Sequence, residues 1–153
     1  MFEKILVPVD GSATSRKGLD AAIALARLSG GRIRVLHAFE PPLLAIGTEF
    51  ALMRGEDIHN VARADGQRCL SEAASSVRAA GLPVEEQLVE CDGKRLSDIV
   101  IENTKAWQAS VIVLGSHGRR GFRRMLLGSD AEQILRTSGV PVMLVRDPES
   151  GDT

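Results

Sequence analysis

Residues 5–38 read ILVPVDGSATSRKGLDAAIALARLSGGRIRVLHA and contain the pattern of a strand, a helix and a second strand. The two apolar runs, Ile5 to Val9 and Ile33 to Ala38, are short and rich in β-branched residues, as buried strands are. Between them, apolar residues recur at spacings of three and four until Gly30-Gly31, a pair typical of a helix that ends in a left-handed residue. We therefore predict a βαβ unit with two parallel strands.

The rest of the chain repeats this alternation of apolar runs and helical segments. The further runs are Val84 to Glu90, Val111 to Leu114 and Val140 to Val145. Helical spacing predicts helices from about Asp57 to Ala80, from Leu96 to Ala106 and from Asp130 onward. Right-handed crossovers between parallel strands leave few topologies. Of these we favour an α/β fold with a single doubly wound five-stranded parallel sheet in the order 3-2-1-4-5. Helices are expected on both faces of this sheet.

Composition predicts one globular domain. The 153 residues are 44% hydrophobic and 25% charged, a balance typical of a single α/β unit with its own core. We assign residues 1–147 to this domain and residues 148–153 to a flexible polar tail. The net charge of −1 argues against a protein that binds nucleic acid through its overall electrostatic field. Such binding must neutralise several phosphates and therefore requires an excess of basic residues or a basic face.

The sequence shows neither the pattern of a signal peptide nor an apolar run of membrane-spanning length. We therefore expect a cytoplasmic protein that does not bind a membrane. Cys69 and Cys91 lack a CxxC spacing and are expected to be reduced cysteines that pack in the core.

Two polar loops meet at one point of the predicted sheet. Val9 to Ser12 follows the first strand, and Gly115 to Gly118 follows the fourth. These strands are predicted neighbours with connections that run to opposite sides, and α/β sheets bind ligands at the carboxyl ends of such strands. Glycines let backbone N–H groups approach a phosphate, and the nearby helix N-terminus adds unpaired donors and a partial positive charge. The two loops therefore predict a phosphate-binding crevice.

The spacing of these glycines resembles that of a known family. Gly115, Gly118, Gly128 and Ser129 match G-x2-G-x9-G-S/T, the phosphate-loop pattern of ATP-binding universal stress proteins. Three further segments are similar to that family, so that the resemblance covers essentially the whole chain: Val7 to Ser12, Leu36 to Ala38 and Val140 to Val145. The resemblance implies an adenine nucleotide alpha hydrolase-like fold and an adenine-nucleotide ligand.

The resemblance also implies a role for each matched residue. Asp10 would face the adenosine end of the ligand, and the backbone of Ala38 would help to hold the adenine. Gly115 and Gly118 would bracket the ribose and the first phosphate, while Gly128 and Ser129 would donate to the outer phosphates. Of the arginines that follow Gly118, Arg119 is the candidate for a phosphate contact. The expected ligand is ATP or AMP, with Mg²⁺ or Mn²⁺ as a candidate companion.

Structural interpretations of the same residues stay open. Asp10 could accept hydrogen bonds from the turn that follows it, and Ser129 could form a capping box with Glu132. His37 and His117 are better explained as structural or phosphate-adjacent side chains than as acid–base catalysts.

Asp130 departs from the family pattern, in which a small apolar residue is common at this position. Its carboxylate favours the helix dipole, but it would repel a triphosphate unless a divalent metal or an arginine intervenes.

The function that we expect is a nucleotide-dependent switch or sensor in the stress response. Two alternatives stay open: a slow ATPase or phosphotransferase that uses Asp10, and a dimeric interaction module that binds no nucleotide. Against an enzyme, the Walker lysine pattern is absent, since Gly93-Lys94 is followed by Arg95.

The fifth predicted strand, Val140 to Val145, lies at the edge of the sheet and is apolar on both faces. Antiparallel pairing of two such edges would build a homodimer with a self-complementary two-fold contact. The alternative is a monomer whose own helices cover this strand.

Overall fold

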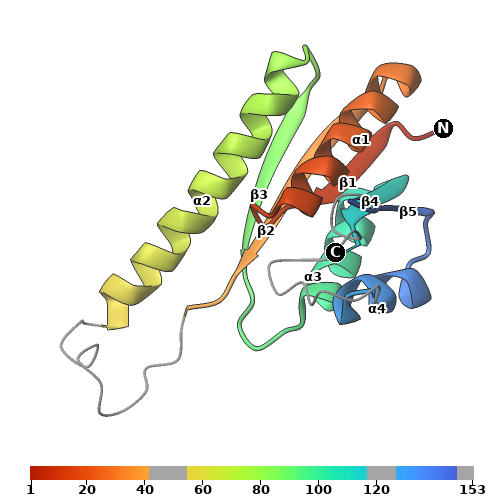
Figure 1. Cartoon of the computed structure of the whole chain (residues 1–153). Coiled ribbons are helices and arrows are strands. Elements are labelled where there is room, and N and C mark those ends of the chain that lie inside the picture. The colour runs from red at the N-terminus through yellow and green to blue at the C-terminus, as the bar shows by residue number, and fades with distance from the viewer. Residues whose placement is uncertain (42–54, 117–126, 148–153) are drawn as a thin grey trace, which may run out of the picture.

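The computed structural model of this chain describes residues 1–41, 55–116 and 127–147 and is drawn in Figure 1. Its elements are β1 (Lys4–Pro8), α1 (Ala13–Ser29), β2 (Arg32–Phe39), α2 (Gly55–Ala79), β3 (Val84–Glu90), α3 (Leu96–Trp107), β4 (Val111–Gly115), α4 (Ser129–Thr137) and β5 (Val142–Val145). These elements alternate as the sequence predicts, and their bounds lie within one or two residues of the expected ones.

The last strand starts at Val142 and not at Val140, and α2 starts at Gly55 and not at Asp57. Pro141 has no N–H to give to a strand ladder. Its carbonyl oxygen still accepts a hydrogen bond from Ile112 N at 3.0 Å. Among the described residues, the segment before Val142 therefore gives the ladder with β4 this acceptor, and the strand itself begins at Val142.

All five strands form one parallel sheet in the order β3-β2-β1-β4-β5. Val7 lies opposite Val35 of β2, and Leu6 lies opposite Ile112 of β4. This arrangement confirms the predicted doubly wound order. It makes β1 and β4 the adjacent central strands whose connections run to opposite sides of the sheet.

Alternation of side chains along the strands divides the interior into two cores. Ile5 and Val7 pack with α1 and α2, and Leu6 packs with α3 and α4; all three side chains are 0% exposed. Figure 1 shows the two helix pairs on opposite faces of the sheet. Burial of each such side chain stabilises the fold by roughly 1.5–3 kcal/mol. Cys69 packs against the first core, and Cys91 is buried in the second.

Helix α1 begins immediately behind the end of β1. Ser12 is its N-cap, and the Ser12 hydroxyl accepts a hydrogen bond from Ser15 N at 3.1 Å. The helix ends at Gly30, whose φ of 69° is the left-handed conformation expected from the sequence. These two ends fix where the first loop of the predicted crevice stands.

Helix α2, of 25 residues, is the longest described helix and packs on β2 and β3. Within the described ranges, no helix is both long and apolar enough to cross a membrane.

Candidate functional site

The two loops singled out in the sequence lie beside each other at the carboxyl ends of β1 and β4. These strands pair directly, with Ile5 opposite Val111 and Leu6 opposite Ile112. Residues 9–12 continue from β1, and Ser116 continues from β4. The sheet order therefore brings the candidate segments to one edge, as predicted.

Asp10 forms the turn that leads from β1 into α1. Its Oδ1 accepts a hydrogen bond from Ser12 N at 2.9 Å, while its own N–H donates to the Ser15 hydroxyl at 3.1 Å. Gly11 between them has a φ of 79°, which glycine adopts without strain. The structural interpretation of Asp10 as a turn former is thus confirmed, and the turn follows the carboxyl end of β1. Its role toward a ligand stays a prediction.

Gly115 is the point where the start of α1 touches the end of β4. A Cβ built on Gly115 would lie 2.8 Å from the carbonyl oxygen and from Cγ2 of Thr14. Packing alone therefore requires a glycine here, because any larger residue would push α1 away from the sheet. The contact with Thr14 therefore explains the first glycine of the motif, independently of any role of Gly115 toward a ribose or phosphate.

The two described ends of the glycine loop are joined at its base. Gly128 N donates to Ser116 O at 3.1 Å, and Ser116 N donates to Val145 O at 2.9 Å. Ser116 is only 2% exposed. The N-terminus of α4 is therefore held against the end of β4, and the loop base is also attached to the edge strand β5.

Ser129 is not a capping residue, so the capping-box interpretation is wrong. The N-cap of α4 is Gly128, and Ser129 is the first helical residue, with an exposed position. The Glu132 carboxylate, which a capping box would need, instead pairs with Arg136 at 2.8 Å. The helix begins one residue earlier than a capping box requires, because the bond from Gly128 to Ser116 already fixes the entering chain.

His37 is a structural side chain, as expected. Its Nδ1 lies 2.7 Å from the carbonyl oxygen of Val9, so this nitrogen donates to the backbone that leaves β1. Gly66 of α2 packs against the imidazole ring, since a Cβ there would lie 2.9 Å from Cδ2 of His37. Ala38 follows at the end of β2, half-buried beside the second core. Its backbone lies at the same edge of the sheet as Asp10.

Asp130 has a contact that the sequence did not predict. Its Oδ1 accepts a hydrogen bond from Ser97 N at 3.3 Å, at the start of α3. Arg95, the N-cap of α3, makes no capping hydrogen bond with its side chain. Asp130 therefore caps a neighbouring helix, and no local pattern in the sequence signals this contact.

Three predicted residues, Gly118, Arg119 and His117, lie outside the described residues. Their proposed roles stay predictions.

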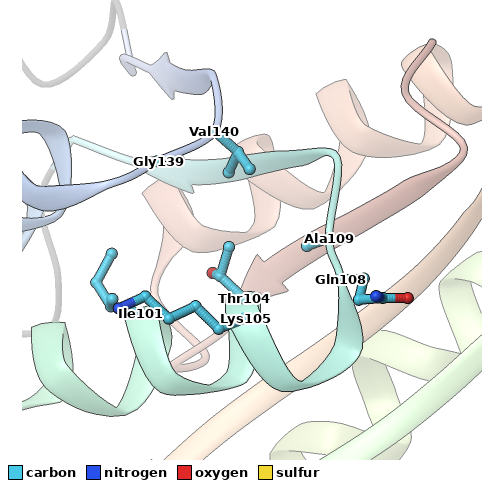
Figure 2. A pocket seen from close by; sticks show the side chains of 7 residues that line it. All are labelled: Ile101, Thr104, Lys105, Gln108, Ala109, Gly139 and Val140. Atoms are coloured by element: carbon cyan, nitrogen blue, oxygen red, sulfur yellow. The ribbon is translucent and has the colours of Figure 1, made fainter.

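A cavity of about 260 Å³ lies elsewhere, between the end of α3 and the turn before β5 (Figure 2). Ala109 precedes β4 and Val140 precedes β5, so this cavity opens at the amino ends of these strands. It is smaller than most ligand pockets, which begin at about 300 Å³. The cavity is separate from the candidate site, which lies at the carboxyl ends.

Proteins of one family are similar to this chain over nearly its whole length. The sequence matches the model of the Universal stress protein family over residues 1–146. It is 30% identical over 151 residues to Universal stress protein YxiE of Bacillus subtilis, with coverage of 95% of this chain and 100% of that protein.

Solved structures agree with this match. The universal stress protein of Archaeoglobus fulgidus in complex with dAMP is 26% identical, with a TM-score of 0.68 and coverage of 95% of this chain and 99% of that one. Protein MJ0577 of Methanocaldococcus jannaschii has a TM-score of 0.80 at 22% identity, with coverage of 96% and 97%, and shares the fold.

Proposed function

Because this chain belongs to the universal stress protein family, we propose that it binds an adenine nucleotide at the carboxyl ends of β1 and β4. The observation that carries the proposal is that a glycine occupies position 128 although the described structure would accept a larger residue there. The φ of Gly128 is −58°, which any residue adopts, and among the described residues a Cβ there would meet only Ser116 O, at an ordinary 3.7 Å. Neither conformation nor packing in the described chain requires this glycine. Close approach of a phosphate to the backbone would require it.

The position of Gly128 supports the same proposal. It stands at the N-terminus of α4, where backbone N–H groups and the helix dipole attract an anion. The hydrogen bond from Gly128 to Ser116 holds this helix end beside the loop that contains Asp10. The Archaeoglobus fulgidus protein, whose structure contains dAMP, is similar over 95% of this chain.

In the proposed complex, the backbone N–H of Ser129 donates to the outer phosphates. The N–H of Gly128 is already bonded to Ser116 O, so the predicted donor role of Gly128 is replaced by one in which its missing side chain lets a phosphate approach the backbone. Asp10 faces the adenosine, and the backbone of Ala38 holds the adenine. Gly115 lies beside the ribose, with Gly118 and Arg119 completing the site from the part of the loop outside the described residues. The proposed ligand is ATP or AMP, and we propose that the chain belongs to the ATP-binding subgroup of its family.

A divalent ion, Mg²⁺ or Mn²⁺, would arrive with the nucleotide. Within the described ranges, no group of three or more His, Cys, Asp and Glu side chains could hold a metal. The phosphate oxygens would therefore supply most of the ligands, as they commonly do for Mg²⁺, and the ion would neutralise part of their charge.

The biological role proposed is that of a cytoplasmic switch or sensor in the stress response. Occupancy of the site would be communicated to the edge strand through Ser116, which joins the loop base at Gly128 to Val145 of β5. The same edge, residues 140–145, is proposed to pair with a second copy in a homodimer. Loop and dimer edge are thus connected by two consecutive hydrogen bonds.

Two measurements test the proposal. Mass spectrometry of the ligand released from freshly purified, denatured protein should detect an adenine nucleotide. In calorimetry, Gly128→Val should weaken the affinity for ATP and AMP at least about tenfold, because its branches occupy the space needed by a phosphate. Its melting temperature should fall by a few degrees at most, because valine is a poorer helix N-cap than glycine.

Gly139→Val is the matched control. Gly139 also lacks a positive φ, and among the described residues a Cβ there meets no atom within 4 Å, but it lies before β5, away from the site. Equal nucleotide affinities for the Gly128→Val and wild-type proteins would contradict the proposed site.

A further inference from the structure

Asp130 is the second residue of α4, yet its carboxylate lies at the first turn of α3. The hydrogen bond from Ser97 N to Oδ1 is 3.3 Å long, and the α3 N-cap, Arg95, gives no side-chain cap of its own. The N-terminal ends of two helices thus surround one carboxylate. Both helix dipoles favour a negative charge at this position.

Within residues 1–41, 55–116 and 127–147, Asp130 forms no ion pair with a basic side chain. Besides burial, the negative charge of Asp130 contributes to the raised pKa of the buried Cys91 thiol. Burial is the main cause that raises the pKa of Cys91, and the carboxylates of Glu40, Asp130 and Glu90 raise it further. A fixed anion therefore stands next to the helix end proposed to bind phosphate.

We infer that Asp130 limits the phosphate charge that this site accepts, so that the site prefers a nucleoside monophosphate to metal-free ATP. ATP binds well only when a divalent cation neutralises part of its charge. This inference rests on the proposed nucleotide function. It is based on the position of Asp130 in α4, directly after Ser129, whose backbone is the proposed donor to the outer phosphates.

The size of the effect follows from Coulomb's law. For two unit charges about 8 Å apart, unscreened repulsion weakens binding by about twofold in a medium as polar as water and by about thirtyfold at an effective dielectric constant of about 20. Because the Debye length in physiological salt is also about 8 Å, screening reduces this effect. ATP carries more negative charge than AMP, so it loses more affinity. The difference should shrink as salt concentration rises.

Two variants separate this charge effect from the structural role of Asp130. Asp130→Asn keeps an oxygen that can accept the hydrogen bond from Ser97 N, but it removes the negative charge. Glu132→Gln removes one negative charge from the first turn of the same helix. The Glu132 side chain is 51% exposed and its carboxylate already pairs with Arg136, so it should matter little to the site.

The experiment is calorimetry with AMP and ATP on the full chain, in EDTA and in Mg²⁺, at low and high NaCl. In EDTA the wild-type protein should bind AMP more tightly than ATP. Asp130→Asn should strengthen ATP binding about tenfold and AMP binding less. Glu132→Gln should leave the ratio of the two affinities unchanged.

Three results would overturn the inference: metal-free ATP binding at least as tightly as AMP, an unchanged ratio in Asp130→Asn, or an equal shift in Glu132→Gln. If Asp130→Asn does not fold, the inference is tested on the wild-type protein alone. Its affinity for ATP relative to that for AMP must then rise when Mg²⁺ is added and when the NaCl concentration is raised, and a constant ratio would overturn the inference. Loss of both nucleotides from every variant and from the wild type would instead refute the proposed function itself.

Discussion

Thr14 lies directly against Gly115, so that a Cβ built on the glycine would stand 2.8 Å from the carbonyl oxygen of Thr14. Gly18, one turn further along α1, makes the complementary approach, since its own Cβ would lie 3.2 Å from Gly115 N. Helix α1 and strand β4 thus meet at two glycines. This contact sets the spacing between the two loops of the candidate site.

Gly115→Ala should therefore destabilise the fold, by about 1–3 kcal/mol, because the methyl group forces α1 away from β4. Urea unfolding followed by circular dichroism measures the loss. Gly139→Ala serves as the control and should change the free energy of unfolding by no more than about 0.5 kcal/mol. Equal stability of the Gly115→Ala and wild-type proteins would show that the helix can move aside.

The proposed homodimer is best tested at Met143, which is 39% exposed on the edge strand β5. Val142 and Leu144 pack against the second core, so lysines there would destabilise a monomer as well. Met143→Lys should instead weaken a β5-mediated dimer at least about tenfold and leave the fold intact. Light scattering across a dilution series reports the mass.

Leu28→Lys is the control for this dimer test, because Leu28 is 87% exposed on α1 and should not affect association. A monomeric mass for the wild-type protein at micromolar concentration would end the dimer proposal.

The ion pair between Arg34 and Glu85 should contribute to stability only above acidic pH. Arg34 Nε donates to Glu85 Oε2 at 3.2 Å, and the guanidinium lies 4.6 Å from the ring centre of Trp107. The hydrogen bond from Arg34 is the main cause that holds the pKa of Glu85 below its usual value. A lowered folded-state pKa means that this stability is present above the unfolded-state pKa and is lost as pH falls through the folded-state value.

Glu85→Gln should accordingly cost about 0.5 kcal/mol at pH 7, a small value because 41% of the Glu85 side chain is exposed. The difference from the wild-type protein should begin to shrink below about pH 4, where the unfolded chain binds the proton, and disappear below the lower folded-state pKa, where both states are protonated. Urea unfolding at a series of pH values measures this difference. A pH-independent difference would show that the carboxylate charge contributes nothing.

The sequence by itself determined the elements and their order. The strand runs around Val7 and Val35 and the helix end at Gly30 depend on local periodicity and on one residue's conformational freedom, both of which can be read from neighbouring residues. Right-handed crossovers then leave few sheet orders, and the predicted one is correct. The meeting of the two loops at β1 and β4 follows from this order.

The structural roles of individual residues at the candidate site became visible only in the tertiary structure. Asp130 and Ser97 are 33 positions apart, and His37 and Val9 are 28 apart, yet each pair shares a hydrogen bond. The two motif glycines also differ in a way that only the tertiary structure shows. The contact with α1 leaves no space for a side chain at Gly115, whereas the described residues would leave space for one at Gly128. Such contacts depend on how helices sit on the sheet. That arrangement is set by the fit of side chains across the whole core, which local periodicity does not encode.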